Sequence, residues 1–323
     1  MSTPTLSSSA TREADRRIRG LRPPKPDVDP YSVHGTTIDA ERRPDGKVER
    51  ALTIFLAGAE CPFTCSFCDL WKWTIDGPTP AGALPKQIED VLNRLDAPHP
   101  DRLKLYNASN FFDTRAVPVT DLPTIAALTA PFAGVTVESH ASTIGPHVAA
   151  FAHQVAGRLE VAIGLETIHP LAATQLNKRL ELGRFDRAAG FLAEQGIDLR
   201  VFVLLGAPHV PIDESVAWTV RTVAYAVERG AAVVSIIPVR GGNGEMERLA
   251  ALGAFTPPTL SQLEDALDAC IGQASTVVTA DLWDVDKIAT CDVCRAARVD
   301  RLARLNGTGR AEPRIACSPC GAA

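Results

Sequence analysis

The chain has 323 residues, of which 46% are hydrophobic and 22% charged, and its formal net charge is −5. These proportions are those of a soluble globular protein, so they argue against general disorder, a fibrous repeat and a surface coated in basic side chains. The length suits one large domain with small appendages. No apolar run reaches the ~18 residues that a membrane span needs, and the N-terminus lacks the apolar stretch of a secretory signal. We therefore expect a cytoplasmic protein without membrane contact.

Residues 1–50 are rich in Ser, Pro and charge, a composition that predicts a flexible N-terminal arm. An Arg- and Ser-rich start resembles a transit peptide, but Glu13 and Asp15 disfavour that interpretation and a solvated tail is simpler. Contact with nucleic acid is a second hypothesis for this arm. The basic residues behind that hypothesis are Arg12, Arg16, Arg17, Arg19, Arg22 and Lys25.

From Ala51 onward, short apolar runs alternate with amphipathic segments, as in strands and helices around a parallel sheet. Six strands are predicted, several rich in Val, Ile or Leu as doubly buried strands should be: 52–56, 103–106, 135–138, 159–164, 199–205 and 233–238. The predicted helices are 86–95, 122–128, 146–155, 185–195, 214–228 and 261–271. Residues 276–283 are a candidate for one more strand. The pattern predicts an α/β fold with a partial (β/α)6 barrel over residues 51–283, whose functional residues lie at the carboxyl ends of the strands.

Three cysteines follow the first predicted strand in the segment Cys61-Pro62-Phe63-Thr64-Cys65-Ser66-Phe67-Cys68. A loop at that position lies at the catalytic end of the predicted barrel. Three thiolates can hold three irons of a 4Fe-4S cluster and leave the fourth iron open for a ligand, whereas an electron-carrier cluster is usually closed by a fourth Cys. The alternative is a structural zinc loop completed by His140 or a C-terminal Cys.

The CxxxCxxC spacing, with an aromatic residue before the last Cys, resembles the signature of the radical S-adenosylmethionine (SAM) superfamily, whose core is shared by the elongator catalytic subunit, methylthiotransferases and NifB. The resemblance implies that Cys61, Cys65 and Cys68 hold a 4Fe-4S cluster whose open iron binds SAM, with Phe67 near the adenine. It also implies reductive cleavage of SAM to a 5'-deoxyadenosyl radical, with an electron from an external reductant such as flavodoxin or ferredoxin. Further stretches resemble the archaeosine synthase radical SAM subunit: 104–113, 137–139, 164–167, 177–178, 234–238, 244–247 and 257–258.

Polar residues at other predicted strand ends are candidates for SAM binding. Many radical SAM enzymes carry a Gly-Gly-Glu segment where this chain has residues 107–110, and Asn107 and Ser109 can accept a hydrogen bond from the SAM ammonium. Glu138 and Glu166 end strands three and four, where a carboxylate can reach the ribose hydroxyls or the methionine part of SAM. A salt bridge to a neighbouring Arg is the alternative for each. Ser235, at the end of strand six, is expected to flank the adenine, with packing as its alternative.

The remaining residues, 284–323, form a Cys-rich tail with two CxxC pairs, Cys291/Cys294 and Cys317/Cys320. Two such pairs supply the four thiolates of a tetrahedral zinc site, and the second pair resembles a zinc knuckle. The same four ligands suit an auxiliary 4Fe-4S cluster. The eighth cysteine, Cys270, falls in an apolar helical stripe and is interpreted as a buried small hydrophobic residue.

The sequence leads to one function and two alternatives. The leading hypothesis is a radical SAM enzyme that acts on an unidentified substrate. One alternative is a tRNA nucleoside-modifying enzyme similar to archaeosine synthase, and the other is a non-catalytic iron-sulfur or zinc protein that binds nucleic acid. Binding of tRNA would depend on the basic N-terminal arm or on the tail arginines Arg298, Arg301, Arg304 and Arg310, and would weaken as salt rises.

Overall fold

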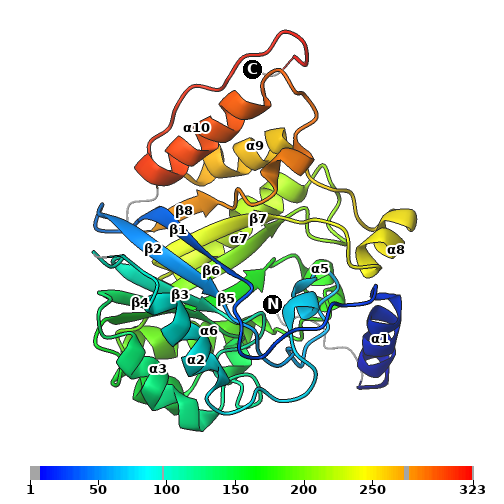
Figure 1. Ribbon diagram of the computed structural model, residues 1–323. Coiled ribbons are helices and arrows are strands. Elements are labelled where there is room, and N and C mark those ends of the chain that lie inside the picture. The colour runs from blue at the N-terminus through cyan, green and yellow to red at the C-terminus, as the bar shows by residue number, and fades with distance from the viewer. Residues whose placement is uncertain (1–7, 97, 273–275, 322–323) are drawn as a thin grey trace.

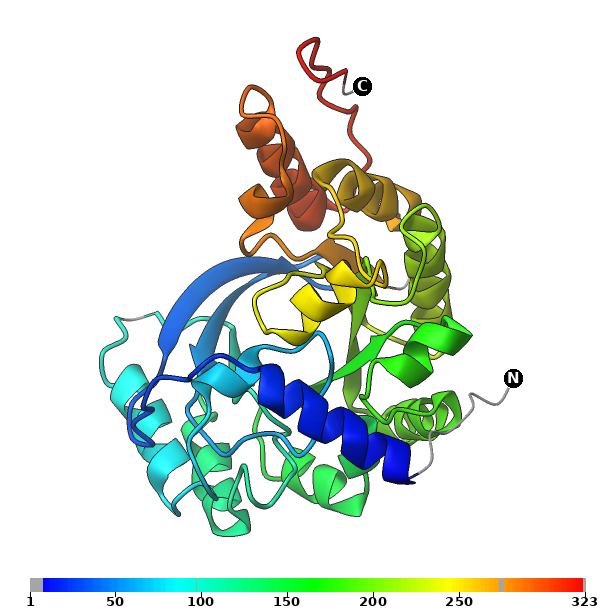
Figure 2. The same cartoon turned by 90° about the vertical axis from the view of Figure 1, so that its right-hand side faces the viewer.

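A computed structural model describes residues 8–96, 98–272 and 276–321. Within them, one sheet has its strands in the order β1 to β8; β1 is antiparallel to β2 and all other neighbours are parallel. The sheet curls into a half-barrel with helices on its outer face (Figure 1; Figure 2). This confirms the predicted partial α/β barrel. The strands are β1 (Gly35–Arg42), β2 (Val48–Phe55), β3 (Arg102–Tyr106), β4 (Gly134–Glu138), β5 (Arg158–Glu166), β6 (Asp198–Leu205), β7 (Val233–Pro238) and β8 (Val277–Ala280).

The strands β2 to β7 coincide with the six predicted ones, and β8 with the additional candidate. Their central residues, such as Leu52, Leu103 and Val161, are at most 1% exposed because helices cover the outer face and side chains fill the inner one. The helices that match the prediction are α2 (Ala83–Leu92), α3 (Leu122–Leu128), α4 (Pro146–Ala152), α6 (Leu182–Glu194), α7 (Ser215–Glu228) and α9 (Leu260–Cys270). A capping box defines the start of α9, where Thr259 and Gln262 exchange side-chain to backbone hydrogen bonds of 3.2 and 2.9 Å.

Four α-helices lie outside the predicted set. They are α1 (Ser8–Leu21), α5 (Pro170–Gln175), α8 (Glu245–Ala251) and α10 (Arg295–Thr308). Short 3-10 helices complete the described elements: η1 (Leu70–Trp73), η2 (Val119–Asp121), η3 (Ala141–Thr143) and η4 (Val285–Ile288). Among the described helices, none is long and apolar enough to cross a membrane.

The expectation of a flexible arm over residues 1–50 is wrong for most of that segment. Strand β1 pairs with β2 along its whole length, from Gly35 opposite Phe55 to Arg42 opposite Val48, so the expected boundary after residue 50 falls inside β2. Helix α1 buries Ala14 and Ile18 against the protein. Two apolar residues on one helical face give too weak a periodic signal to reveal such a helix. Residues 1–7 lie outside the described part of the chain.

Paired charges fill the amino-terminal half of the barrel interior. Glu160 of β5 is fully buried between Arg200 of β6, at 2.7 Å, and Arg43, at 2.8 Å. Arg200 also pairs with Glu41 of β1 at 2.8 Å, and Lys104 of β3 contacts the same carboxylate. Burial raises the pKa of Glu41, but Arg200 and Lys104 together lower it to about 2. These charges therefore pair with one another in the amino-terminal half of the barrel, and the cysteine loop lies at the opposite, carboxyl end of the strands.

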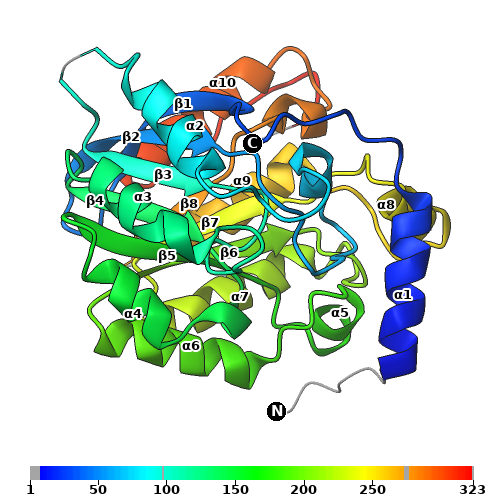
Figure 3. The same ribbon diagram turned by 60° about the horizontal axis from the view of Figure 1, so that its bottom comes forward.

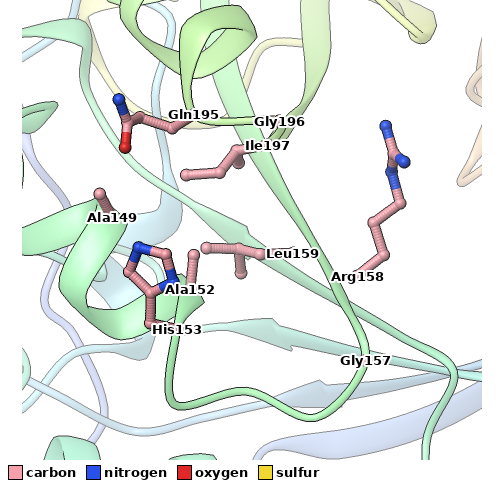
Figure 4. A pocket seen from close by; sticks show the side chains of 9 residues that line it. All are labelled: Ala149, Ala152, His153, Gly157, Arg158, Leu159, Gln195, Gly196 and Ile197. Atoms are coloured by element: carbon pink, nitrogen blue, oxygen red, sulfur yellow. The ribbon is translucent and has the colours of Figure 1, made fainter.

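A surface pocket lies at the amino-terminal ends of the strands, opposite the end that carries the cysteine loop (Figure 4). Its lining includes His153 after α4, Arg158 and Leu159 at the start of β5, and Gln195 and Ile197 just before β6. The amino-terminal ends of barrel strands generally serve stability and not catalysis. We therefore do not assign the function to this pocket.

Candidate functional site

The three cysteines of the first motif lie on the loop that connects the carboxyl end of β2 to η1, the end of a barrel where catalytic residues gather. Cys61, Cys65 and Cys68 are free, partly buried thiols. Burial raises the pKa of all three, to about 12 for Cys68, so the thiols alone stay protonated at neutral pH. A bound metal reverses this preference, because a coordinating thiol is deprotonated.

Side-chain amides from two distant segments fix the backbone of this cysteine loop. Asn177, after α5, donates to the Thr64 carbonyl at 3.0 Å. Asn243, just before α8, donates to the carbonyls of Ser66 at 2.8 Å and Cys68 at 3.1 Å. The loop is thereby held between the ends of β5 and β7, a role for Asn243 that its glycine-rich surroundings did not indicate.

Helix α1 lies across the cysteine loop, beside α5 and α8 at one end of the strands (Figure 2; Figure 3). The Asp15 carboxylate accepts hydrogen bonds from Thr64 Oγ1 at 2.6 Å and Asn177 Nδ2 at 2.9 Å, and it pairs with Arg179. Three basic residues of the expected arm also form ion pairs with acidic residues of the same chain. Their ion pairs are Arg17–Glu245 at 3.2 Å, Arg22–Glu60 at 2.8 Å and Lys25–Asp76 at 2.6 Å.

A buried cation stands close to the cysteines. Lys178 Nζ pairs with Glu166 Oε1 at 2.6 Å and interacts electrostatically with Cys61 and Cys65. Burial alone would lower the pKa of Lys178, but the Glu166 carboxylate raises it above its usual value, so the amine stays charged. Glu166 ends β5 at a bulge with φ of +67°, a strained conformation typical of functional sites. The sequence offered Lys178 only as part of a resemblance, because its spacing carries no chemical signal.

The segment after β3 carries polar groups without partners. Asn107 is fully buried, and neither its amide nitrogen nor its oxygen has a hydrogen-bond partner within the described residues. The same is true of Ser109 Oγ. Asn110 Nδ2 donates to Cys61 Sγ at 3.5 Å, which joins this segment to the cysteine loop. Buried polar groups are normally satisfied, so these atoms are candidates for binding a ligand.

Two further polar side chains lie near the loop, the half-buried Glu138 and the buried His140. Burial raises the pKa of Glu138, at the end of β4, to about 7, against the opposing effects of Lys178 and the Ala108 backbone. His140 stacks on Phe63 with ring centroids 4.2 Å apart, and its Nε2 lacks a hydrogen-bond partner in the described structure. Burial lowers the pKa of His140 to about 3, so this ring is neutral.

Phe67 and Ser235 are the two residues expected beside the adenine. Phe67 packs against an apolar cluster that includes Leu176 and Met246. Ser235 lies in the middle of β7, and its hydroxyl accepts a hydrogen bond from Thr279 of β8 at 3.3 Å. Its expected position at the end of the strand is therefore wrong, because β7 continues to Pro238.

The four cysteines of the tail converge although 22 residues separate the two pairs. The sulfurs of Cys291, Cys294, Cys317 and Cys320 all lie within 4.8 Å of one another. Helix α10 follows the first pair, and two of its arginines are turned inward: Arg298 pairs with Glu264 at 2.6 Å, and Arg301 with Asp268 at 2.7 Å. These two residues are at most 6% exposed, so they are not available to RNA.

Comparison with solved structures gives matches of low sequence identity. The archaeal Elp3 from Methanocaldococcus infernus, with an N-terminal deletion, aligns with 83% of this chain and 65% of its own at 11% identity and a TM-score of 0.51. The coproporphyrinogen III oxidase HemN from Escherichia coli, a radical SAM enzyme, covers 78% of this chain and 54% of its own at 15% identity and a TM-score of 0.43.

The radical SAM methyltransferase TsrM from Kitasatospora setae aligns with 58% of this chain at 15% identity and a TM-score of 0.41. The chain spans only 37% of the length of TsrM. No protein-family model and no curated protein matches the chain. The Elp3 match nevertheless agrees with the half-barrel, and the chain has a fold similar to that of Elp3.

Proposed function

We propose that the chain is a radical SAM enzyme in which Cys61, Cys65 and Cys68 hold a 4Fe-4S cluster. The observation that carries this proposal is the set of three partly buried free thiols at the carboxyl end of β2, next to buried polar atoms without partners among the described residues. When bound, the cluster would supply the single electron that cleaves SAM to methionine and a 5'-deoxyadenosyl radical. An external reductant such as flavodoxin or ferredoxin would deliver that electron.

The residues present fit the charge of such a group. Thiolates carry negative charge, and the buried Lys178 ammonium is the cation that acts on Cys61, Cys65 and Cys68. The Asn110 amide donates to Cys61 Sγ, and hydrogen bonds to sulfur tune the potential of iron-sulfur sites. We therefore assign to Lys178 and Asn110 the role of stabilising the thiolates.

The residues around the loop also fit SAM. Asn107 and Ser109 have free hydrogen-bonding atoms that can accept from the SAM ammonium or donate to its carboxylate. Glu138 offers a carboxyl group for the ribose hydroxyls. One oxygen of Glu166 is engaged by Lys178, which leaves the other for the cofactor. Phe67 directly precedes Cys68 and would offer an apolar surface to the adenine.

Helix α1 and Trp71 help to exclude water from the site. Arg22, directly after α1, lies over the Trp71 ring, 4.7 Å from its centroid, and pairs with Glu60 at the start of the cysteine loop. The role of these contacts is to keep the loop closed, because a radical generated on SAM must meet its substrate and not solvent.

The tRNA hypothesis loses part of its support. Arg298, Arg301, Arg17 and Arg22 all pair with acidic residues of the same chain. No other observation on the described residues favours a polynucleotide substrate over a small molecule. We therefore keep the general radical SAM activity as the proposal.

The test is reductive SAM cleavage by anaerobically reconstituted protein, measured as 5'-deoxyadenosine. The product should be abolished by each of three single substitutions: Cys61→Ala, Cys65→Ala and Cys68→Ala. The reason is that two thiolates cannot hold a cluster that needs three and leaves its fourth iron open. Cys270→Ala is the matched control, since Cys270 is buried between helix and sheet away from the loop. Production near the wild-type level in any of the three loop variants would refute the proposal.

A further inference from the structure

We propose that Cys291, Cys294, Cys317 and Cys320 bind one zinc ion, and that this ion fastens the C-terminal tail across the open side of the half-barrel. This inference goes beyond the proposed function, because reductive cleavage of SAM does not require a second metal. It also decides between the two metals that the sequence left open. The argument rests on the sulfur geometry and on what the tail contacts.

The spacing of the four sulfurs suits a single ion. Cys291 Sγ and Cys317 Sγ are 3.9 Å apart, and Cys294 Sγ and Cys320 Sγ are 3.7 Å apart. A tetrahedral zinc with Zn–S bonds of about 2.3 Å places its sulfurs about 3.8 Å apart. In a 4Fe-4S cluster each thiolate binds a different iron, and these bonds diverge, so the sulfurs must stand farther apart than on one ion.

The surroundings of the four thiols indicate a structural site. Four protein ligands leave no open position for water or substrate, as in structural zinc sites. Four thiolates around Zn²⁺ also carry a net negative charge, and the buried Arg298 lies close enough to reduce it. Arg298 NH1 lies 4.0 Å from Cys294 Sγ, while its NH2 pairs with Glu264 of α9 at 2.6 Å.

The site lies at the start of a helix that bridges the two edges of the sheet. Cys294 is the N-cap of α10, and α10 packs on both β1 and β8, which do not pair with each other in the described structure (Figure 1). Asn306 of α10 makes two hydrogen bonds of 2.8 Å, to the backbone N–H and the carbonyl of Ala280 in β8. At the end of α10, Gly309 approaches Arg42 of β1 so closely that a Cβ would collide with the guanidinium.

Helix α10 is therefore the element that covers the gap between the edge strands. It is held by the fully buried Leu302 and Leu305, by Asn306 and by two buried arginines. Arg301 pairs with Asp268 of α9 at 2.7 Å and donates to the Glu312 carbonyl of the tail at 2.6 Å. A zinc ion that joins residues 291–294 to residues 317–320 would close this segment into a loop and so restrict its opening.

The experiment is metal analysis of three anaerobically purified full-length proteins: wild type, the triple variant Cys61→Ala/Cys65→Ala/Cys68→Ala, and the double variant Cys291→Ser/Cys317→Ser. We expect about one zinc per chain in the wild type and in the triple variant, and none in the double variant. Hydrogen exchange in α10 and β8 should be faster in the double variant, whereas exchange in α1 should not change. Cys270→Ser serves as the control for loss of a buried thiol.

Retention of about four irons by the triple variant would overturn the zinc proposal, because it would place a cluster in the tail. A wild-type protein with iron but no zinc, which also fails to bind Co²⁺ in a tetrahedral thiolate environment by its visible spectrum, would overturn it as well. The Co²⁺ measurement needs no substitution, so misfolding of a variant cannot decide the result. Zinc without any iron in the wild type would refute the proposed radical SAM cluster and leave the zinc site standing.

Discussion

The substitution Asp15→Asn tests whether α1 holds the cysteine loop. The Asp15 carboxylate joins α1 to Thr64, Asn177 and Arg179, and its side chain is 19% exposed. Asparagine keeps one acceptor oxygen but loses the charge and the bond to Arg179. A hydrogen bond to a charged group contributes about 1.5–3 kcal/mol, and because this site is partly exposed we expect the lower end, about 1.5–2 kcal/mol.

That free energy corresponds to a roughly 10- to 30-fold more frequent opening of α1. Hydrogen exchange of the α1 amides should accelerate by this factor, and iron should be lost faster to a chelator because Thr64 lies between Cys61 and Cys65. Glu13→Gln is the matched control, since Glu13 is exposed on the same helix and the substitution removes the same charge. Equal exchange and chelation rates in the two variants would refute the role of Asp15.

Two predictions concern carboxylates on the barrel strands, the buried Glu160 and the half-buried Glu138. Glu160→Gln should lower the free energy of unfolding by about 3–5 kcal/mol in denaturant titrations, because it leaves Arg43 and Arg200 buried without their shared partner. The control is Glu228→Gln, in an exposed pair with Arg229, which should lower the free energy of unfolding by less than about 1 kcal/mol. A similar loss in both would contradict the assigned burial. Because the pKa of Glu138 is raised to about 7, the folded state retains a proton that the unfolded state releases above its ordinary pKa of about 4.3. The stability of cluster-free protein should therefore fall as pH rises from about 4.3 to 7 and then level off, by no more than about 3.7 kcal/mol, and a Glu138→Gln variant with the same slope would exclude this origin.

The barrel and the position of its cysteine loop follow from local patterns in the sequence. Strands β2 to β7 could be predicted because each buries a continuous apolar run, and the length and spacing of such runs depend on local residues alone. The cysteine spacings were equally local. Residues 107–110 were found for the same reason, since polar side chains directly after a buried strand stand out from their neighbours.

The distant residues that support that loop are identified only in the folded chain. Asp15, Lys178 and Asn243 lie far from Cys61 along the chain, and none belongs to a recognisable spacing, so their roles depend on how the ends of the strands are brought together. The same holds for β1, whose alternation is irregular and which is fixed by pairing with β2. Arg298 and Arg301 looked like a basic surface because a sequence shows charge but not burial. Their acidic partners on α9 lie more than 30 positions away and meet them only in the folded chain.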